Sequence, residues 1–181
     1  MPISAFPDHT LESAPAAARR TMAAVTAKQG YLPSAVARLA TSPELLDSFL
    51  KASAAFESTT LDPLSREVLI MTMATGNDCH VCVAMHTAKL TALGAGPEVV
   101  AALRERRALP DERLQAVRVF TLAVIATAGA VDDATLQAFQ AHGYTARNAL
   151  EVVLGIGTYT MSTLANRMTG APVDPQLAAF A

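Results

Sequence analysis

The sequence predicts an all-α fold, and two observations favour it. Helix-start signals recur along the chain, where a capping residue or a proline opens a new segment at Ser42-Pro43, Asp62-Pro63, Gly96-Pro97 and Pro110-Asp111. Strand signals are nearly absent, because aromatic residues make up 5% of the chain and no alternating β-branched run lies between Asn-Gly or Asp-Gly turns. Alanine, the strongest helix former, is abundant instead.

The chain length predicts one domain. Its 181 residues, of which 51% are hydrophobic, are enough for a single compact core. We expect residues 1–12 to form a loose N-terminal arm and residues 13–181 to form one helical domain. The expected helices span residues 13–28, 33–41, 43–57, 63–75, 79–93, 97–107, 111–128, 133–142 and 146–167.

Two of these helices are apolar around much of their circumference. Helix 111–128 carries Val119, Phe120, Leu122, Val124 and Ile125, and helix 146–167 carries Val152, Val153, Leu154 and Ile156. Such helices lie in the centre of a domain or at a subunit interface. Together with a mean hydropathy of +0.29, this pattern predicts a homo-oligomer.

Charge and hydropathy exclude several classes of partner. The net charge is −2, from 14 basic and 16 acidic residues in no long run, so neither nucleic acid nor an anionic membrane surface is expected to bind. The longest apolar stretch, residues 119–131, is too short to cross a bilayer, and the N-terminus lacks the pattern of a secretory signal. We therefore expect a cytoplasmic protein.

Both cysteines lie in one short segment, which we interpret as the active site. Residues 76–87 read Gly-Asn-Asp-Cys-His-Val-Cys-Val-Ala-Met-His-Thr, so Cys79 and Cys82 are three residues apart and His86 follows four residues later. In a helix, steps of about 100° per residue place all three within roughly 60° of one another. Two such thiols can form a disulfide, and the imidazole can exchange the proton that converts a thiol to a thiolate. His80 lies about 100° away from this stripe.

The expected position of the thiols in their helix favours ionisation. Asn77 or Asp78 can serve as the N-cap, which would put Cys79 and Cys82 in the first helical turn. The helix dipole and the unpaired N–H groups there stabilise an anion. We expect the pKa values of both thiols to be lowered.

Glu67 is a candidate fourth member of the site. It lies among Leu64, Ile70, Met71 and Ala74 when the preceding helix is drawn as a wheel, so it is a carboxylate on an apolar face. Burial is expected to raise its pKa toward the range useful for a general base. A structural pairing with Arg66 or Arg104 is the alternative. Tyr159 can also reach the site, although a core tyrosine bonded to a backbone carbonyl is the simpler interpretation.

Three other functions stay open for the cysteine pair. Cys79, Cys82, His86 and Glu67 form a chemically adequate zinc set, although a lone CxxC usually needs a second pair to complete a structural site. The thiols can instead pack as ordinary core residues of an oligomeric binding protein. They can also serve a disulfide reductase or a redox sensor without peroxidase turnover.

The spacing of Glu67, Cys79-x-x-Cys82 and His86 resembles the signature of the alkyl hydroperoxidase D-like branch of the carboxymuconolactone decarboxylase superfamily. Further matching segments are Gly30-Tyr31-Leu32-Pro33-Ser34, Leu39-Ala40-Thr41-Ser42-Pro43, Ala165-Asn166-Arg167-Met168-Thr169-Gly170 and Pro172-Val173-Asp174. The resemblance covers roughly residues 28–180 and implies an AhpD-like helical bundle that assembles as a trimer, dimer or hexamer. Because the decarboxylase branch generally lacks the CxxC pair, the two cysteines argue against lactone decarboxylation.

The resemblance also implies roles for the four residues in the reduction of a hydroperoxide substrate. Cys82 is the nucleophile that becomes a sulfenic acid, and Cys79 donates a proton and then resolves the sulfenic acid as a disulfide. Glu67 is the general base and His86 the proton relay. At the position where well-studied members carry a further relay histidine, this chain has Val81.

The expected site needs no bound cofactor or metal. No nucleotide or flavin motif is evident, since Gly94 and Gly96 are not preceded by a strand. Electrons must then come from a small thiol or, as the resemblance implies, from a lipoylated partner protein.

Overall fold

The computed structural model of the chain describes residues 5–181, and this part contains ten helical elements and no strand. In chain order they are α1 (Ala16–Gln29), α2 (Ser34–Leu39), α3 (Pro43–Glu57), α4 (Pro63–Gly76), α5 (His80–Ala92), α6 (Pro97–Arg104), α7 (Glu112–Ala126), α8 (Asp133–Ala141), α9 (Ala146–Thr169) and the 3₁₀ helix η1 (Pro175–Phe180).

The predicted all-α fold is confirmed. Each of the nine expected helices is present, with ends shifted by a few residues, and η1 is the element that the sequence analysis missed. Of the expected arm, residues 1–4 lie outside the described chain. Residues 5–12 carry no helix, and Asp8 forms an ion pair with Arg38 of α2 at 2.7 Å.

Side-chain caps explain where most long helices begin. Thr145 and Asn148 form a reciprocal capping box at the start of α9. Four further N-cap side chains each accept a hydrogen bond from the backbone N–H three residues further along, and they are Ser42, Asp62, Asp111 and Asp132. These caps satisfy donors that the first helical turn leaves free.

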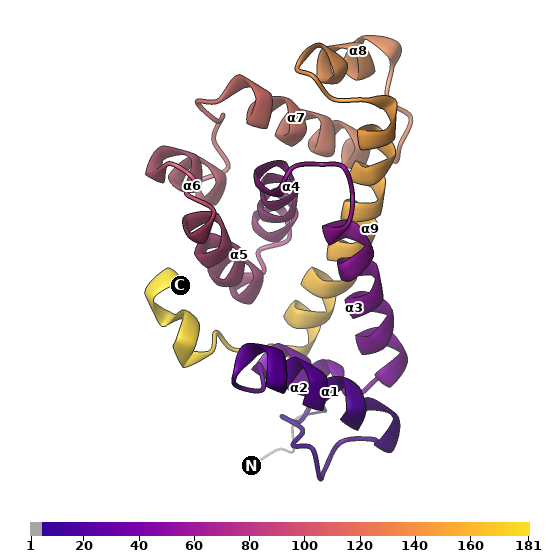
Figure 1. The fold of residues 1–181 in the computed structure, drawn as a ribbon, viewed down its shortest axis with the longest axis vertical. Helices are drawn as coiled ribbons and strands as arrows, with labels where there is room; N and C mark the ends of the chain where they lie inside the picture. The colour runs from indigo at the N-terminus through magenta and orange to yellow at the C-terminus, as the bar shows by residue number, and fades with distance from the viewer. Residues whose placement is uncertain (1–4) are drawn as a thin grey trace.

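The centre of the domain is α4. Ten of its fourteen residues are buried, and α5, α6, α7 and α9 surround it (Figure 1). Of the two positions expected for α7 and α9, the centre is taken by α4, and a subunit interface stays a prediction, because each helix buries one face and leaves apolar side chains exposed on the other. Val119, Leu122 and Ile125 of α7 are 40–48% exposed.

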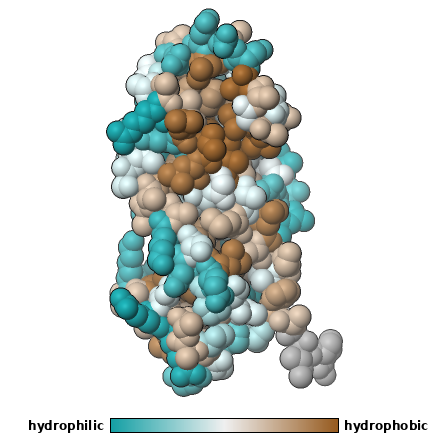
Figure 2. Space-filling view, turned by 90° about the vertical axis from the view of Figure 1, so that its right-hand side faces the viewer, coloured by the Kyte–Doolittle hydropathy of each residue, from teal (hydrophilic) through white to brown (hydrophobic). Residues whose placement is uncertain are grey.

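The outer face of α9 is an apolar stripe. Five large side chains on it are 37–73% exposed, namely Leu150, Val153, Leu154, Leu164 and Met168, and helical steps of about 100° place them on one side of the helix. Figure 2 shows apolar surface gathered on the side of the molecule where α8 and α9 lie. This face fits the predicted homo-oligomer, which stays a prediction.

None of the helices in residues 5–181 combines the length and hydropathy needed to cross a membrane. This includes α9, whose 24 residues would be long enough.

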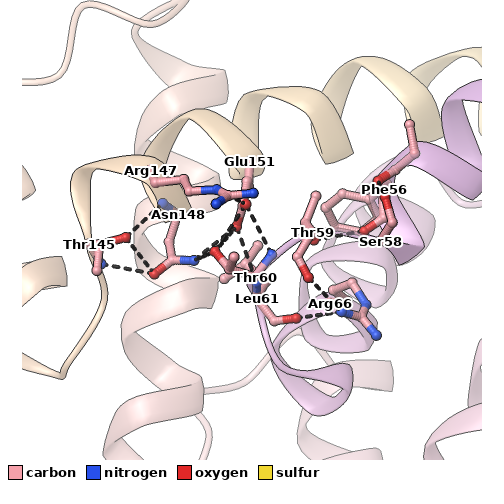
Figure 3. Close-up of polar contacts among 11 residues, drawn as sticks. Phe56, Ser58, Thr59, Thr60, Leu61, Arg66, Thr145, Arg147, Asn148 and Glu151 are labelled. Carbon is pink, nitrogen blue, oxygen red and sulfur yellow. Dashed lines mark hydrogen bonds and ion pairs between the residues drawn. The ribbon is translucent and has the colours of Figure 1, made fainter.

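A buried carboxylate ties the start of α4 to α9. Glu151 accepts hydrogen bonds from the backbone N–H groups of Thr60 and Leu61 at 3.0 and 3.1 Å, and from the Asn148 amide at 2.9 Å (Figure 3). Burial alone would raise the pKa of Glu151, but the bonds from Thr60 and Asn148 outweigh it and lower the pKa. The α3–α4 connection is therefore fixed by a charged acceptor on α9.

Close packing of α9 against α3 and α4 requires a glycine. A Cβ atom added at Gly155 would lie 2.7 Å from the Phe56 ring and 2.8 Å from the Leu69 side chain. Gly157, one half-turn away on the exposed side, has no such neighbour within 4 Å. The two glycines of one helix thus face opposite environments.

We expect opposite stability changes from alanine at these two positions. Gly155→Ala should lower the free energy of unfolding by about 1–3 kcal/mol, because Phe56 and Leu69 must shift. Gly157→Ala should raise it by about 0.5–1 kcal/mol through helix propensity. Urea unfolding of both variants at one protein concentration measures the difference. A Gly155→Ala variant as stable as the wild type would contradict the close packing.

Candidate active site

The site is built around the three-residue connection between α4 and α5, which is Asn77-Asp78-Cys79. Asn77 is the C-cap of α4, and Asp78 takes the left-handed conformation (φ 50°) that ends a helix. The N–H of Asp78 bonds to the carbonyl of Thr75, and the N–H of Cys79 bonds to the carbonyl of Ala74 at 2.9 Å. This pair of bonds is a Schellman motif, so the ending of α4 holds the backbone of Cys79.

Cys79 is itself the N-cap of α5. Its backbone is extended (φ −87°, ψ 93°), and its carbonyl accepts the first bond of α5, from Val83 N–H. The expected N-cap role of Asn77 or Asp78 is therefore wrong, because both residues are used to end α4. The carboxylate of Asp78 pairs instead with Arg106 and Arg167.

The structure brings the two free thiols into direct contact. The Sγ atoms of Cys79 and Cys82 are 2.7 Å apart, and both residues are buried, with 2% and 3% exposure. A disulfide bond is about 2.05 Å long, so only a small movement closes it. The predicted redox pair is thus assembled with a separation suited to reversible oxidation.

The two thiols have opposite acidities. The pKa of Cys79 is lowered to about 7. The main cause is the contact with the Cys82 thiol, and the Asn166 amide and the charge of Arg167 act in the same direction, whereas burial acts against them. The pKa of Cys82 is raised, because its proton is shared with Cys79 and because it is buried. The expectation of two lowered pKa values holds for Cys79 and is wrong for Cys82. Deprotonation of the pair therefore places the negative charge mainly on Cys79.

Glu67 of α4 and His86 of α5 are in direct contact. Glu67 Oε2 lies 2.6 Å from His86 Nδ1, and both side chains are buried. Burial acts to raise the pKa of Glu67, but the interaction with His86, aided by the nearby charges of Lys89 and Arg66, outweighs it and lowers the pKa. The expected raised pKa is wrong, and Glu67 is a carboxylate at neutral pH.

The alternative arginine partners of Glu67 are engaged elsewhere. Arg66 donates to the carbonyl of Leu61, and Arg104 donates to Thr87 Oγ1 at 3.1 Å. The charged side chain that approaches Glu67 is Lys89, at 3.8 Å. Glu67 therefore faces the site rather than a structural arginine pair.

Helix α9 supplies site residues that the sequence analysis did not assign. Cys82 Sγ lies 3.4 Å from Asn166 Nδ2 and 3.8 Å from Ser162 Oγ. The ring of Tyr159 meets the ring of His86 edge-on at 5.5 Å, and its hydroxyl lies near Ser53 Oγ at 3.4 Å rather than on a backbone carbonyl. Burial raises the pKa of Tyr159 to about 12. The available signal was polar residues at helical spacing, 159, 162 and 166, within an apolar helix.

A cavity of about 470 Å³ opens beside Cys79, between the start of α5 and the end of α9. His80, which spacing placed away from the reactive stripe, is exposed and lines this cavity, whereas Val81 is almost fully buried. The complete lining is Asp78, Cys79, His80, Val81, Asn166, Arg167, Gly170 and Ala171. A small molecule in this cavity reaches the Cys79 end of the pair.

The candidate zinc set is not assembled as a ligand cluster. Across residues 5–181, no group of three or more His, Cys, Asp or Glu side chains is placed to hold a metal ion. His86 Nδ1 is directed at Glu67 instead.

The shared proton predicts a pH profile for thiol alkylation. In the wild type, reaction with iodoacetamide should rise with a midpoint near pH 7, the pKa of Cys79. Cys82→Ser removes the sulfur contact that lowers this pKa, so the midpoint should move toward the ordinary value of about 8.5. Cys79→Ser should leave a slower thiol with a midpoint above that value. A Cys82→Ser variant that still titrates near 7 would show that the sulfur contact is not the cause.

Comparison with known proteins agrees with the predicted resemblance. Residues 42–122, which contain Glu67, both cysteines and His86, match the model of the Carboxymuconolactone decarboxylase family. A search of the curated proteins finds no match.

Solved structures share the fold over almost the whole chain. The alkylhydroperoxidase AhpD core protein from Ralstonia eutropha JMP134, described as peroxidase-related, has 24% identity and a TM-score of 0.83, covering 98% of this chain and 95% of its own. A peroxidase-related protein from Silicibacter sp. TM1040 has 19% identity and a TM-score of 0.79, with coverage of 96% and 92%. The debrominase Bmp8, solved with 2,3,4-tribromopyrrole, has 14% identity and a TM-score of 0.77, with coverage of 99% and 96%. Residues 42–122 thus match the carboxymuconolactone decarboxylase family model, and the chain has the AhpD-like fold.

Proposed function

We propose that this protein is a thiol-dependent hydroperoxide reductase. The observation that carries the proposal is the contact at 2.7 Å between the two free cysteines, beside a cavity and one helical turn from a buried Glu67–His86 pair. A close pair of thiols, one of which has a lowered pKa, is typical of redox-active cysteines. The fold shared with two peroxidase-related proteins supports the same function.

The first step would convert the reduced pair into a nucleophile. One proton of the two thiols passes to the His86–Glu67 pair, with Glu67 as the general base and His86 as the relay. The remaining proton moves between the sulfurs, and its transfer to Cys79 leaves a thiolate on Cys82. The Asn166 amide at 3.4 Å stabilises that thiolate.

The second step would reduce the peroxide. The Cys82 thiolate attacks the terminal oxygen, the O–O bond breaks, and the departing alkoxide takes the proton of Cys79 to become an alcohol. Cys82 is now a sulfenic acid, and Cys79 is a thiolate. Cys79 then attacks the Cys82 sulfur, and the hydroxide leaves as water with the proton returned by His86. In total, two thiols and one hydroperoxide give a disulfide, an alcohol and water.

An external thiol would return the disulfide to the reduced state. Cys79 is the sulfur that lines the cavity, so it is the one that an incoming thiol or a lipoyl group of a partner protein can reach. Thiol–disulfide exchange there restores both thiols with two electrons from the reductant.

Two neighbouring functions use the same pair on another electrophile. A disulfide reductase or redox sensor would exchange with a disulfide faster than it reacts with hydroperoxide. The fold shared with Bmp8, a debrominase, adds a brominated pyrrole to the compounds worth testing. An unreactive pair would instead indicate a non-catalytic binding protein.

A stoichiometric pulse of organic hydroperoxide tests the proposed reaction. We expect the fully reduced protein to lose both thiols and two hydrogens of mass, as one disulfide forms. Cys79→Ser should stop at a sulfenic acid on Cys82 that dimedone traps, and Cys82→Ser should form no sulfenic acid at that rate. Intact-mass analysis measures all three. Unchanged wild-type thiols would reject the peroxidase, and trapping on Cys79 would reverse the two roles.

We also propose that a second copy of this chain covers the apolar stripe of α9, as the hydropathy of the sequence predicts. Leu150 and Met168, at the two ends of the stripe, are each 73% exposed, and contiguous apolar surface of this kind is typical of subunit interfaces.

Charges on this stripe should separate the subunits. Light scattering should give the wild type a mass that is a multiple of 18.9 kDa, and Leu150→Glu with Met168→Glu should shift it toward one chain. Ala23→Glu, an exposed position on α1, is the matched control and should not change the mass. A wild-type mass of one chain would overturn the proposed assembly.

A further inference from the structure

Asn166 carries a buried acceptor that the protein leaves unused. The residue is 6% exposed, and its Oδ1 atom, which is shielded from bulk solvent, has no hydrogen-bond partner within the described chain. Buried side-chain oxygens are almost always bonded, and one that is not commonly marks a functional site. Among residues 5–181 it is the one side-chain nitrogen or oxygen atom in this condition.

The position of Asn166 connects the cavity to the thiols. It lies in the last turns of α9 and lines the cavity together with Cys79. Its Nδ2 group faces Cys82 Sγ at 3.4 Å and Ser162 Oγ at 3.5 Å. The Nδ2 side of the amide therefore contacts Cys82, while the Oδ1 acceptor on the other side has no partner within the described chain.

The two charged side chains of the cavity, Asp78 and Arg167, are already engaged. Arg167 donates to the carbonyl of Asn77 at 2.7 Å and pairs with Asp78. Asp78 is also held by Arg106. A ligand beside the thiols thus finds its free hydrogen-bond acceptor in Asn166 rather than in these charged residues.

We propose that Asn166 is a substrate-binding residue whose Oδ1 accepts a hydrogen bond from the O–H of a hydroperoxide. This inference rests on the proposed peroxidase function and adds the group that orients the substrate. The bond holds the terminal oxygen, which is the atom that the thiolate attacks, within reach of the sulfur that Nδ2 contacts. The site then favours oxidants that carry a donor on the reacting atom.

Two reagents separate this role from a general effect on the thiols. An organic hydroperoxide carries the O–H donor, whereas methyl methanethiosulfonate reacts with thiolates and has no donor. We expect Asn166→Leu, introduced together with Cys79→Ser so that both reagents react at Cys82, to lower the ratio of the hydroperoxide rate constant to the methanethiosulfonate rate constant about tenfold, as loss of one oriented hydrogen bond predicts. Asn166→Asp keeps an acceptor, so it should preserve the ratio although its charge slows both reactions.

Ser162→Ala is the matched control. It removes the other polar neighbour of Cys82, at 3.8 Å, and one partner of Asn166 Nδ2, at 3.5 Å, but it keeps the Asn166 Oδ1 acceptor. Its two rate constants should change by the same factor. Thermal unfolding of each variant checks the fold, and Asn166→Ala replaces the leucine variant if that protein does not fold.

The outcomes distinguish this inference from the proposed function. Equal losses in both rates for Asn166→Leu, or no loss in either, would overturn the role of Asn166 while leaving the peroxidase in place. A wild-type protein that reacts with methanethiosulfonate but not with hydroperoxide would overturn the peroxidase and this inference together. A selective loss restored by aspartate would support both.

Discussion

The turn at Asn77-Asp78 is the constraint on which the site depends. The backbone N–H of Cys79 completes the ending of α4, and its carbonyl begins α5, so one residue belongs to the hydrogen bonding of both helices. This fixes the Cys79 backbone within two residues of the central helix of the domain. The left-handed conformation of Asp78, which costs less for aspartate than for most residues, folds α5 back beside α4. From that one reversal follow the contact between the thiols and the contact of His86 with Glu67.

The two buried carboxylates of the domain, Glu67 and Glu151, are tolerated because each has a hydrogen-bond partner. An isolated carboxylate in the centre of a helical domain would take up a proton, yet Glu67 remains ionised beside His86. Glu151, at the other end of the domain, is kept ionised by backbone N–H groups of the α3–α4 connection. Glu151 therefore fixes the start of α4 to α9 through the α3–α4 connection. Glu67, within α4, fixes this helix to His86 of α5. The central helix is positioned by polar contacts as well as by its apolar packing.

The sequence was sufficient for the helices and for the grouping of Cys79, Cys82 and His86 along one helix, because these depend on local rules. Ser42, Asp62 and Asp111 each precede one helix and cap it. The spacing of Cys79, Cys82 and His86 places them along one side of α5, beginning at its N-cap. The predictions that were wrong concerned pKa values, which depend on contacts between side chains. The pKa of Glu67 follows from a 2.6 Å bond across two helices, and the difference between the thiols follows from a contact of sulfur with sulfur. Tyr159, Ser162 and Asn166 enter the site through helix packing some eighty residues away.

The residues around Cys79 and Cys82 act on the acidity of the two thiols in opposite directions. A single isolated thiol with a pKa near 7 would react both with peroxides and with disulfides. In a pair with one proton, the charge can rest on Cys79, which lines the cavity, or on Cys82, which contacts Asn166, so reactivity depends on which sulfur holds the proton. Asn166 contacts Cys82 and Arg167 acts on Cys79, so α9 influences that choice from both sides. Movement of α9 by a fraction of an ångström would therefore alter the chemistry of α5 without touching the cysteines.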